Sequence, residues 1–63
     1  MTVREIEKLL RKADWYEVRT KGGHKHFGHD DYAYVVTVPQ HKGDLKTKTA
    51  KSILEEAGIR GGK

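Results

Sequence analysis

The sequence contains no cysteine, only one proline and no long apolar run. Without cysteine, the chain has neither disulfide bonds nor thiolate ligands for a metal. No apolar stretch approaches the ~18 residues of a membrane-spanning helix, and no signal peptide is visible. These absences predict a soluble, cytoplasmic protein that makes no contact with a membrane.

Length and charge narrow the class of protein further. The 63 residues suffice for a single domain over residues 1–63, and a chain of this length buries only roughly 60% of its unfolded surface. Its stability is therefore expected to be marginal. Hydrophobic and charged residues each make up 35% of the chain, and the formal net charge is +4. The positive charge favours an acidic partner, either a nucleic acid or an acidic protein.

The first segment with a clear period is a predicted helix over residues 3–13. Thr2 and Glu5 have the spacing of a capping box, in which each side chain accepts a hydrogen bond from the other residue's backbone N–H. Apolar residues recur on one face: Val3, Ile6, Leu9, Leu10 and Ala13. The polar face of this amphipathic helix is expected to carry Arg4, Glu7, Lys8, Arg11 and Lys12.

Three short strands are predicted to follow, over residues 16–20, 24–28 and 32–38. The first alternates and is rich in strand-forming residues, and the third is the strongest β segment of the chain. Gly22 and Gly23 predict a type I′ hairpin turn between the first two, which needs a positive φ at both positions. Pro39 cannot donate a hydrogen bond to a neighbouring strand and should end the third strand.

A polar connection over residues 40–48 leads to a second predicted helix over residues 49–57. Gly58 suits the left-handed position after this helix, and Ile59 suits the apolar contact that closes such a cap. Residues 60–63 are expected to form a frayed tail. The predicted core residues are Val3, Ile6, Leu9, Leu10, Trp15, Val18, Phe27, Val36, Val38, Ile53 and Leu54.

The resulting α-β-β-β-α order predicts an α+β fold. Three antiparallel strands have one face that both helices can cover, so we expect a two-layer sandwich with three strands in the sheet and both helices on one side. The other face of the sheet is then open to solvent or to a partner. Alternation along the strands leaves open which of the two faces carries Phe27.

Four histidines occur in the chain: His24, His26, His29 and His41. A metal site is one interpretation, because His24 and His26 would share a strand face and His29 or His41 could supply a third ligand. In a regular strand, however, His29 would point to the other face, and no cysteine joins the set. The pattern therefore favours a site without a metal.

Acid–base catalysis by His24 is the second interpretation. A histidine with an ordinary pKa near ~6.5 accepts or donates a proton at physiological pH. His24 follows the glycine pair, where a substrate can approach the backbone closely, and cations are expected around it from Arg19, Lys21, Lys25 and Lys42. Such a site suits RNA, which carries its own 2′-hydroxyl nucleophile, whereas DNA hydrolysis usually recruits metal ions. The plain alternative is a solvated histidine without a chemical role.

Three segments of the chain resemble, in order and spacing, those of a family of small toxins. Residues 22–27 (GGHKHF) are similar to its Gly-Ser-His segment with a following aromatic, and residues 38–41 (VPQH) to its Val-Pro-x-His segment. The third is similar to its closing helix and comprises Leu45, Lys46, Thr49, residues 52–54 and residues 57–59. Over nearly its whole length the chain thus resembles the HicA toxins, which cleave messenger RNA and are neutralised by HicB antitoxins.

The resemblance implies a double-stranded-RNA-binding-like fold and an endoribonuclease that uses a histidine, with no metal and no other cofactor. His24 falls on the catalytic histidine of the family. The implied partners are mRNA and a HicB-like antitoxin. Two departures from the family pattern are Gly23, which replaces the usual serine, and Lys48, which replaces a glycine.

The predicted site therefore consists of one catalytic residue and a cationic surface. The residues predicted to contact RNA are Arg19, Lys21, Gly22, Gly23, Lys25 and Lys42. The group that protonates the leaving oxygen is left open between His26, His41 and a water. Two other functions remain in play: a non-catalytic RNA-binding module, and a protein-interaction domain that docks an acidic regulator.

Overall fold

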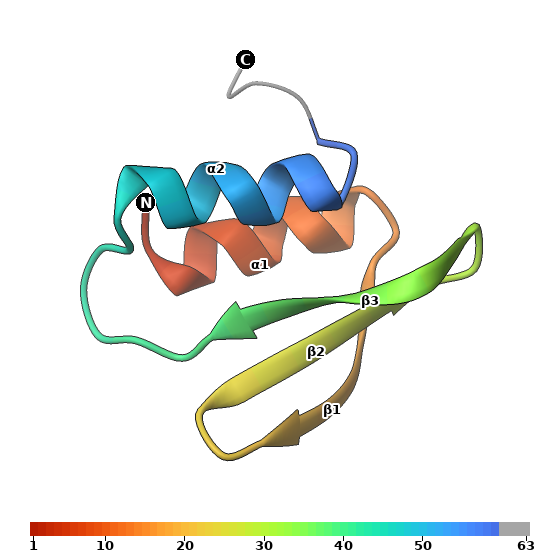
Figure 1. Cartoon of the computed structure of the whole chain (residues 1–63), viewed down its shortest axis with the longest axis horizontal. Coiled ribbons are helices and arrows are strands. Elements are labelled where there is room, and N and C mark those ends of the chain that lie inside the picture. The colour runs from red at the N-terminus through yellow and green to blue at the C-terminus, as the bar shows by residue number, and fades with distance from the viewer. Residues whose placement is uncertain (60–63) are drawn as a thin grey trace.

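A computed structural model describes residues 1–59, and the tail predicted at residues 60–63 lies outside the described residues. The elements are α1 (Val3–Lys12), β1 (Tyr16–Lys21), β2 (His24–His29), β3 (Tyr32–Pro39) and α2 (Thr47–Glu56), as Figure 1 shows. The predicted α-β-β-β-α order is confirmed. Neither helix in this part of the chain has the length and the apolar composition to cross a lipid bilayer.

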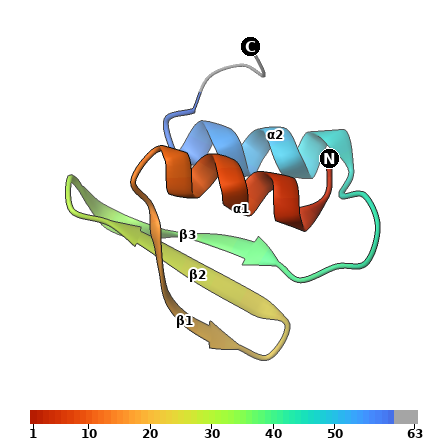
Figure 2. The same ribbon diagram turned by 180° about the vertical axis from the view of Figure 1, so that it is seen from behind.

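The three strands form one antiparallel sheet in the order β1-β2-β3. Both helices lie side by side over one face of this sheet, and the view from behind in Figure 2 shows the same arrangement. The predicted two-layer α+β sandwich is therefore confirmed. Within residues 1–59 no helix or strand covers the opposite face, which we call the open face.

Local signals fix the ends of the helices. Thr2 and Glu5 form the predicted capping box at the start of α1, with hydrogen bonds of 2.8 and 3.2 Å. Gly58 has a φ of +74°, and the N–H of Ile59 donates to the carbonyl of Leu54 at 2.9 Å, which closes the predicted cap after α2. The start of α2 was predicted two residues too late, because Lys46 at its N-cap makes no side-chain capping bond that would mark it.

The core lies between the helices and the covered face of β2 and β3. Its buried apolar residues are Ile6, Leu10, Trp15, Phe27, Val36, Val38, Leu45, Ala50, Ile53, Leu54 and Ala57. Phe27 therefore points to the covered face. The core prediction was wrong for Val18, which is 48% exposed because all of β1 lies at the outer edge of the sheet, away from the helices. Val3 and Leu9 are only partly buried against the core.

The hairpin between β1 and β2 has a two-residue turn, as predicted, but of another type. Gly22 has a φ of +57°, whereas Gly23 is not among the residues with positive φ. A type I′ turn needs positive φ at both central positions, so that prediction was wrong. Within the turn, the N–H of His24 donates to the carbonyl of Gly22 at 2.9 Å. The turn places His24 opposite Lys21, and β3 places Pro39 on the other side of His24.

An aromatic cluster closes the far end of the sheet. The indole N–H of Trp15 donates to the backbone carbonyl of Ala57 at 3.1 Å, which joins residues 42 positions apart in the sequence. The Trp15 ring lies 5.0 Å from the rings of His29 and Tyr32, measured between centroids. These contacts fix the last residue of β2 against the end of α2.

Candidate functional site

His24 is the first residue of β2 and lies on the open face of the sheet. It is directly opposite Lys21 in β1 and Pro39 in β3, and residues paired across antiparallel strands share a face. The side chain is exposed, and no hydrogen-bond partner of its ring occurs within residues 1–59. A solvent-facing imidazole with both nitrogen atoms available has what a proton acceptor for a bound substrate needs.

His26 lies two residues further along the same face. Its Cα is expected about 6.6 Å from that of His24, from the rise of a strand. Its paired residues are Arg19 in β1 and Thr37 in β3, and its Nδ1 atom is 3.0 Å from the hydroxyl oxygen of Thr37. The His26 ring is partly buried and oriented by this hydrogen bond, unlike the ring of His24.

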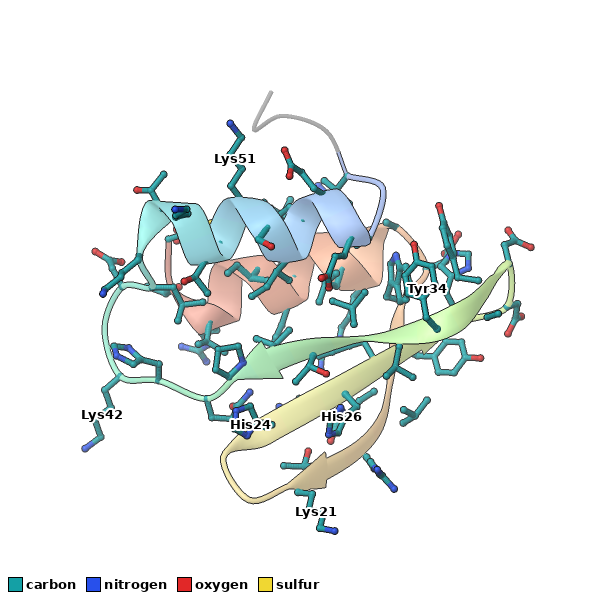
Figure 3. The ribbon with its side chains drawn as sticks, in the orientation of Figure 1. Lys21, His24, His26, Tyr34, Lys42 and Lys51 are labelled. Carbon is teal, nitrogen blue, oxygen red and sulfur yellow. The ribbon has the colours of Figure 1, made fainter. Side chains whose placement is uncertain are left out.

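Part of the predicted cationic surface gathers at the end of the sheet that carries His24. Figure 3 shows Lys21 on the hairpin and Lys42 in the connection after β3 at this end. Both side chains are exposed, as are those of Arg19 and His41. The structure therefore brings Lys21 next to His24 and Arg19 next to His26, while His41 and Lys42 follow Pro39 on the adjoining segment.

Lys25 differs from the other predicted RNA contacts, because it lies on the covered face. Its side chain is 21% exposed, and its Nζ atom is 3.4 Å from a carboxylate oxygen of Glu7 and 4.0 Å from one of Glu17. These two ion pairs favour a role within the domain. The contact between Lys25 and RNA stays a prediction.

The position of Glu7 corrects the sequence interpretation of the first helix. Glu7 was expected on the polar face, yet it is only 7% exposed. It lies one turn from Val3 and from Leu10, at the border of the apolar face, and there the cations Lys25 and Arg11 surround its carboxylate at 3.4 and 3.8 Å. The periodicity of α1 cannot reveal this, because the compensating Lys25 comes from β2.

Gln40 connects this buried carboxylate to the turn before His24. Its side-chain amide donates to Glu7 Oε2 at 3.2 Å and to the Val38 carbonyl at 3.3 Å. Its backbone N–H donates to the carbonyl of Gly23 at 2.7 Å. Gln40 therefore extends the pairing of β3 with β2 by one residue beyond Pro39.

The remaining histidine of β2 is bound within the domain. His29 Nδ1 accepts a hydrogen bond from the N–H of Asp31 at 3.0 Å, so Nε2 carries the proton that is donated to the Ala13 carbonyl at 3.0 Å. Among residues 1–59, no three histidine, aspartate or glutamate side chains lie in an arrangement that would hold a metal ion.

Near His29, the hydrogen bond from Tyr16 to Asp30 and the negative charge of Asp30 raise the pKa of Tyr16 above its ordinary value of 10.0.

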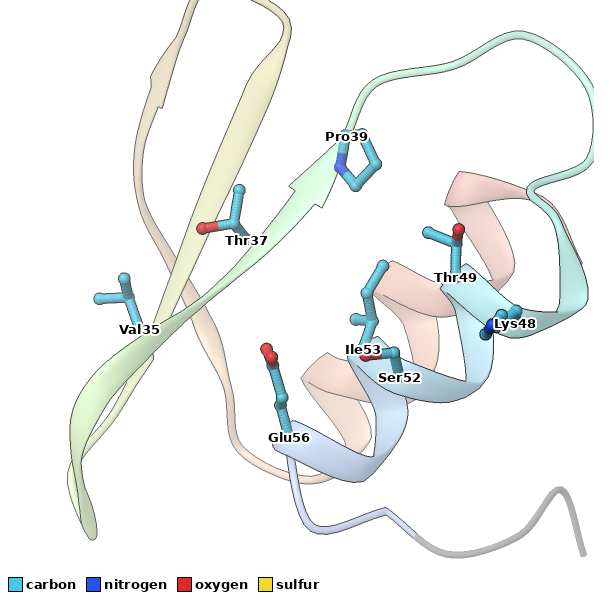
Figure 4. A pocket seen from close by; sticks show the side chains of 8 residues that line it. All are labelled: Val35, Thr37, Pro39, Lys48, Thr49, Ser52, Ile53 and Glu56. Atoms are coloured by element: carbon cyan, nitrogen blue, oxygen red, sulfur yellow. The ribbon is translucent and has the colours of Figure 1, made fainter.

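A groove of about 600 Å³ runs between β3 and α2, as Figure 4 shows. Thr37 and Pro39 line its strand side, and Lys48, Thr49 and Ser52 line its helix side. Because Pro39 is paired with His24, one end of this groove adjoins the strand position of His24. Hydroxyl groups and one ammonium group at that end can donate hydrogen bonds to an acidic ligand.

Sequence reasoning missed the groove and the buried link between α1 and the hairpin. Both arise from residues far apart in the chain, so no local pattern indicates them. Lys48, which lines the groove, drew notice in the sequence only as a departure from the resemblance, without indicating a groove.

Comparison with known proteins finds one family that covers nearly all of the chain. No curated protein matches this sequence. A family model described as the HicA toxin of bacterial toxin–antitoxin systems matches residues 3–59, which include all five elements of the structure. Toxins of such systems have a cognate antitoxin as their partner. The chain belongs to the HicA toxin family.

Proposed function

We propose that this protein is an endoribonuclease that cleaves mRNA with His24 as the general base and without a metal ion. His24 takes the proton of a ribose 2′-hydroxyl, and the resulting oxygen attacks the adjacent phosphorus. The bond from phosphorus to the 5′-oxygen breaks, so the products are a 2′,3′-cyclic phosphate and a 5′-hydroxyl. The observation that carries the proposal is an exposed imidazole between Lys21 and Pro39 on the open face, with no hydrogen bond to its ring from residues 1–59.

The surroundings of His24 supply the positive charge that phosphoryl transfer needs. Lys21 is directly opposite His24, Arg19 is opposite His26, and Lys42 lies at the same end of the molecule. Cations aimed at the phosphoryl oxygens stabilise the charge that develops in the transition state. General base catalysis contributes about 10²- to 10⁴-fold, so positioning and charge supply the rest of the rate enhancement.

The glycine turn and the groove define where RNA would pass. Gly22 and Gly23 have nothing within 4 Å of the position of an added Cβ, so the backbone beside His24 is open to a close approach. From His24 the RNA strand would continue past Pro39 into the groove, and Lys48, which lines it, would contact a phosphate there. The leaving oxygen takes its proton from His26, His41 or a water.

Membership of the toxin family gives the protein a cognate antitoxin, which we propose is HicB-like. The surface around His24 is cationic, so an antitoxin that matches it would present carboxylates in place of the phosphates of RNA. Such a partner would inhibit the toxin by covering His24.

The test is incubation of the purified protein with a long RNA in excess EDTA. The wild-type protein should cleave the RNA, and the products should carry cyclic phosphates. His24→Ala and His24→Gln should both be inactive, because neither side chain can accept the proton, while the fold is kept since the exposed ring packs little.

Two results would favour the rival functions. Tight RNA binding without cleavage would make the protein a non-catalytic RNA-binding module. If the protein neither binds nor cleaves RNA but binds the acidic antitoxin tightly, it would be a protein-interaction domain.

A further inference from the structure

Glu7 is the one buried charged residue within residues 1–59. A carboxylate that is taken out of water needs cations or hydrogen-bond donors to compensate the loss of hydration. Its Oε2 atom has two such partners, the Lys25 ammonium at 3.4 Å and the Gln40 amide at 3.2 Å. Arg11 Nη1 is 3.8 Å from its Oε1 atom. These contacts tie α1 to both β2 and the end of β3.

Both partners of Oε2 lead to His24. Lys25 is the residue after His24, and Gly23 is the residue before it. Glu7 holds Lys25 directly through the ion pair. It holds Gly23 through Gln40, because the Gln40 side chain donates to Glu7 while the Gln40 N–H donates to the Gly23 carbonyl at 2.7 Å. One carboxylate on α1 thus restrains both chain neighbours of His24 from the opposite side of the sheet.

Stability alone is a weak reason for this arrangement. A buried ion pair often contributes nothing compared with apolar residues of the same volume, because dehydration of the charges offsets their attraction. The hairpin end, by contrast, needs a restraint, since a glycine turn leaves the backbone before His24 free to vary. A displacement of about 1 Å at a reacting group can cost about 10²-fold in rate.

We propose that Glu7 is a positioning residue that holds the backbone of His24 in the geometry for proton abstraction. It acts through Lys25 on one side of His24 and through Gln40 and Gly23 on the other. The inference rests on the proposed function of His24, and Glu7 itself touches no substrate.

The experiment compares Glu7→Gln and Glu7→Met with the matched control Glu17→Gln. Glu17 also pairs with Lys25, at 4.0 Å, but it is exposed and has no contact with Gln40. We expect both Glu7 variants to lose about 10- to 100-fold in kcat with KM within about twofold of wild type. Glu7→Met should melt no lower than Glu7→Gln, and Glu17→Gln should keep the wild-type kcat.

Coupling between Glu7 and Lys25 provides the second readout. Lys25→Met keeps the aliphatic part of the side chain and should lower kcat as well. If both residues act through the same restraint, the double variant Glu7→Gln/Lys25→Met loses no more than the worse single variant. If the fold losses in kcat of the two single variants multiply in the double variant, the inference is overturned.

Three other results would also overturn it. They are a wild-type kcat in Glu7→Gln, an equal loss in Glu17→Gln, and a loss of kcat that tracks a lower melting temperature across the variants. If the wild-type protein cleaves no RNA, the proposed function fails. The restraint on the backbone of His24 is then tested by NMR relaxation. The backbone order parameters of Gly23 and His24 should then fall in Glu7→Gln but not in Glu17→Gln, and unchanged values would refute the restraint.

Discussion

Strand β2 begins and ends with a histidine, and the two have opposite surroundings. The ring of His24 is exposed, lies next to Lys21, and makes no hydrogen bond within the described residues. His29 uses both ring nitrogens in hydrogen bonds of 3.0 Å and packs against Trp15 and Tyr32, with centroid distances of 5.0 and 4.9 Å. The same side chain is therefore available for chemistry at one end of the strand and is part of the framework at the other.

Charge differs between the two ends as well. Lys21 and Lys42 lie at the His24 end, whereas Asp14, Asp30 and Asp31 surround a hollow beside His29. An RNA molecule would be attracted to the first end and repelled from the second. Neither the residue type nor its strand identifies a site, because the two histidines at the ends of β2 have opposite neighbours. The neighbours that each turn brings to the histidine decide its role.

Exchanging each histidine for alanine should give the largest difference between the two ends. His24→Ala is expected to lower the rate of RNA cleavage by at least about 10²-fold, because the proposed general base is lost. His29→Ala should cleave within a few-fold of wild type at a temperature where it remains folded. Single-turnover cleavage of one RNA by both variants is the measurement, and equal losses would remove the distinction.

Binding of the antitoxin should protect one end more than the other. At a free antitoxin concentration of about 100 Kd, the complex gains about 2.7 kcal/mol, and each kcal/mol raises the melting temperature of so small a domain by roughly 4–8 °C. Amide hydrogen exchange should slow at Gly23 and His24 and change less at Asp30 and Asp31. A structure of the complex with His24 open to solvent would refute inhibition by covering the site.

The framework role of His29 predicts a loss of stability. His29→Ala removes two hydrogen bonds of about 1 kcal/mol each, so we expect about 2 kcal/mol less free energy of unfolding. His24→Ala should change the free energy of unfolding by less than about 0.5 kcal/mol, as is usual for exposed residues. Urea denaturation of both variants measures the difference, and a His24→Ala that unfolds more easily than His29→Ala would reverse the assignment.

The charge difference predicts a selective effect of salt. For single-stranded RNA, the logarithm of the affinity should fall with the logarithm of salt by about 0.7 for each phosphate contact. The double variant Lys21→Gln/Lys42→Gln should show a shallower slope, by about 1.4 if each lysine makes one contact. Asp30→Asn, at the other end, is the control and should leave the slope unchanged. A wild-type affinity that does not vary with salt would contradict the cationic surface.

The smallest effect concerns Tyr16 and alkaline pH. Its hydrogen bond to Asp30 and the charge of Asp30 raise its pKa above 10.0 in the folded state. The stabilisation is therefore fully present below pH 10 and is lost as the pH rises through the folded pKa. In a spectrophotometric titration, a tyrosine should ionise above pH 10, and Tyr16→Phe or Asp30→Asn should remove that late component. A titration curve unaltered by Asp30→Asn would contradict the bond.

The elements that local chemistry specifies were predicted from the sequence. Thr2 and Glu5 sit three residues apart and need only each other to cap α1, and Gly58 needs only its own freedom at positive φ to end α2. The start of α2 was missed because Lys46 provides no capping side chain. The turn type at Gly22 was missed because glycine accepts several turns, and the strands that flank it select one.

In the candidate site, too, the features set by local sequence were predicted and those set by distant residues were not. The spacing in the hairpin places His24 beside Lys21 and on one face with His26, and this follows from strand alternation. The buried state of Glu7 did not follow, because its partners come from residues 25 and 40 of the chain. Val18 has the residue type of a core position, yet its exposure depends on where the helices end over the sheet.

The hydrogen bond from the Trp15 indole to the Ala57 carbonyl gives the molecule a built-in optical reporter. Trp15 is the only tryptophan in the chain, so its fluorescence comes from one known place. Release of the C-terminal end of α2 would expose the indole to water and shift its emission to longer wavelength. A time-resolved measurement of this emission would therefore record how often the end of α2 detaches from Trp15, with no label added and with the face around His24 untouched.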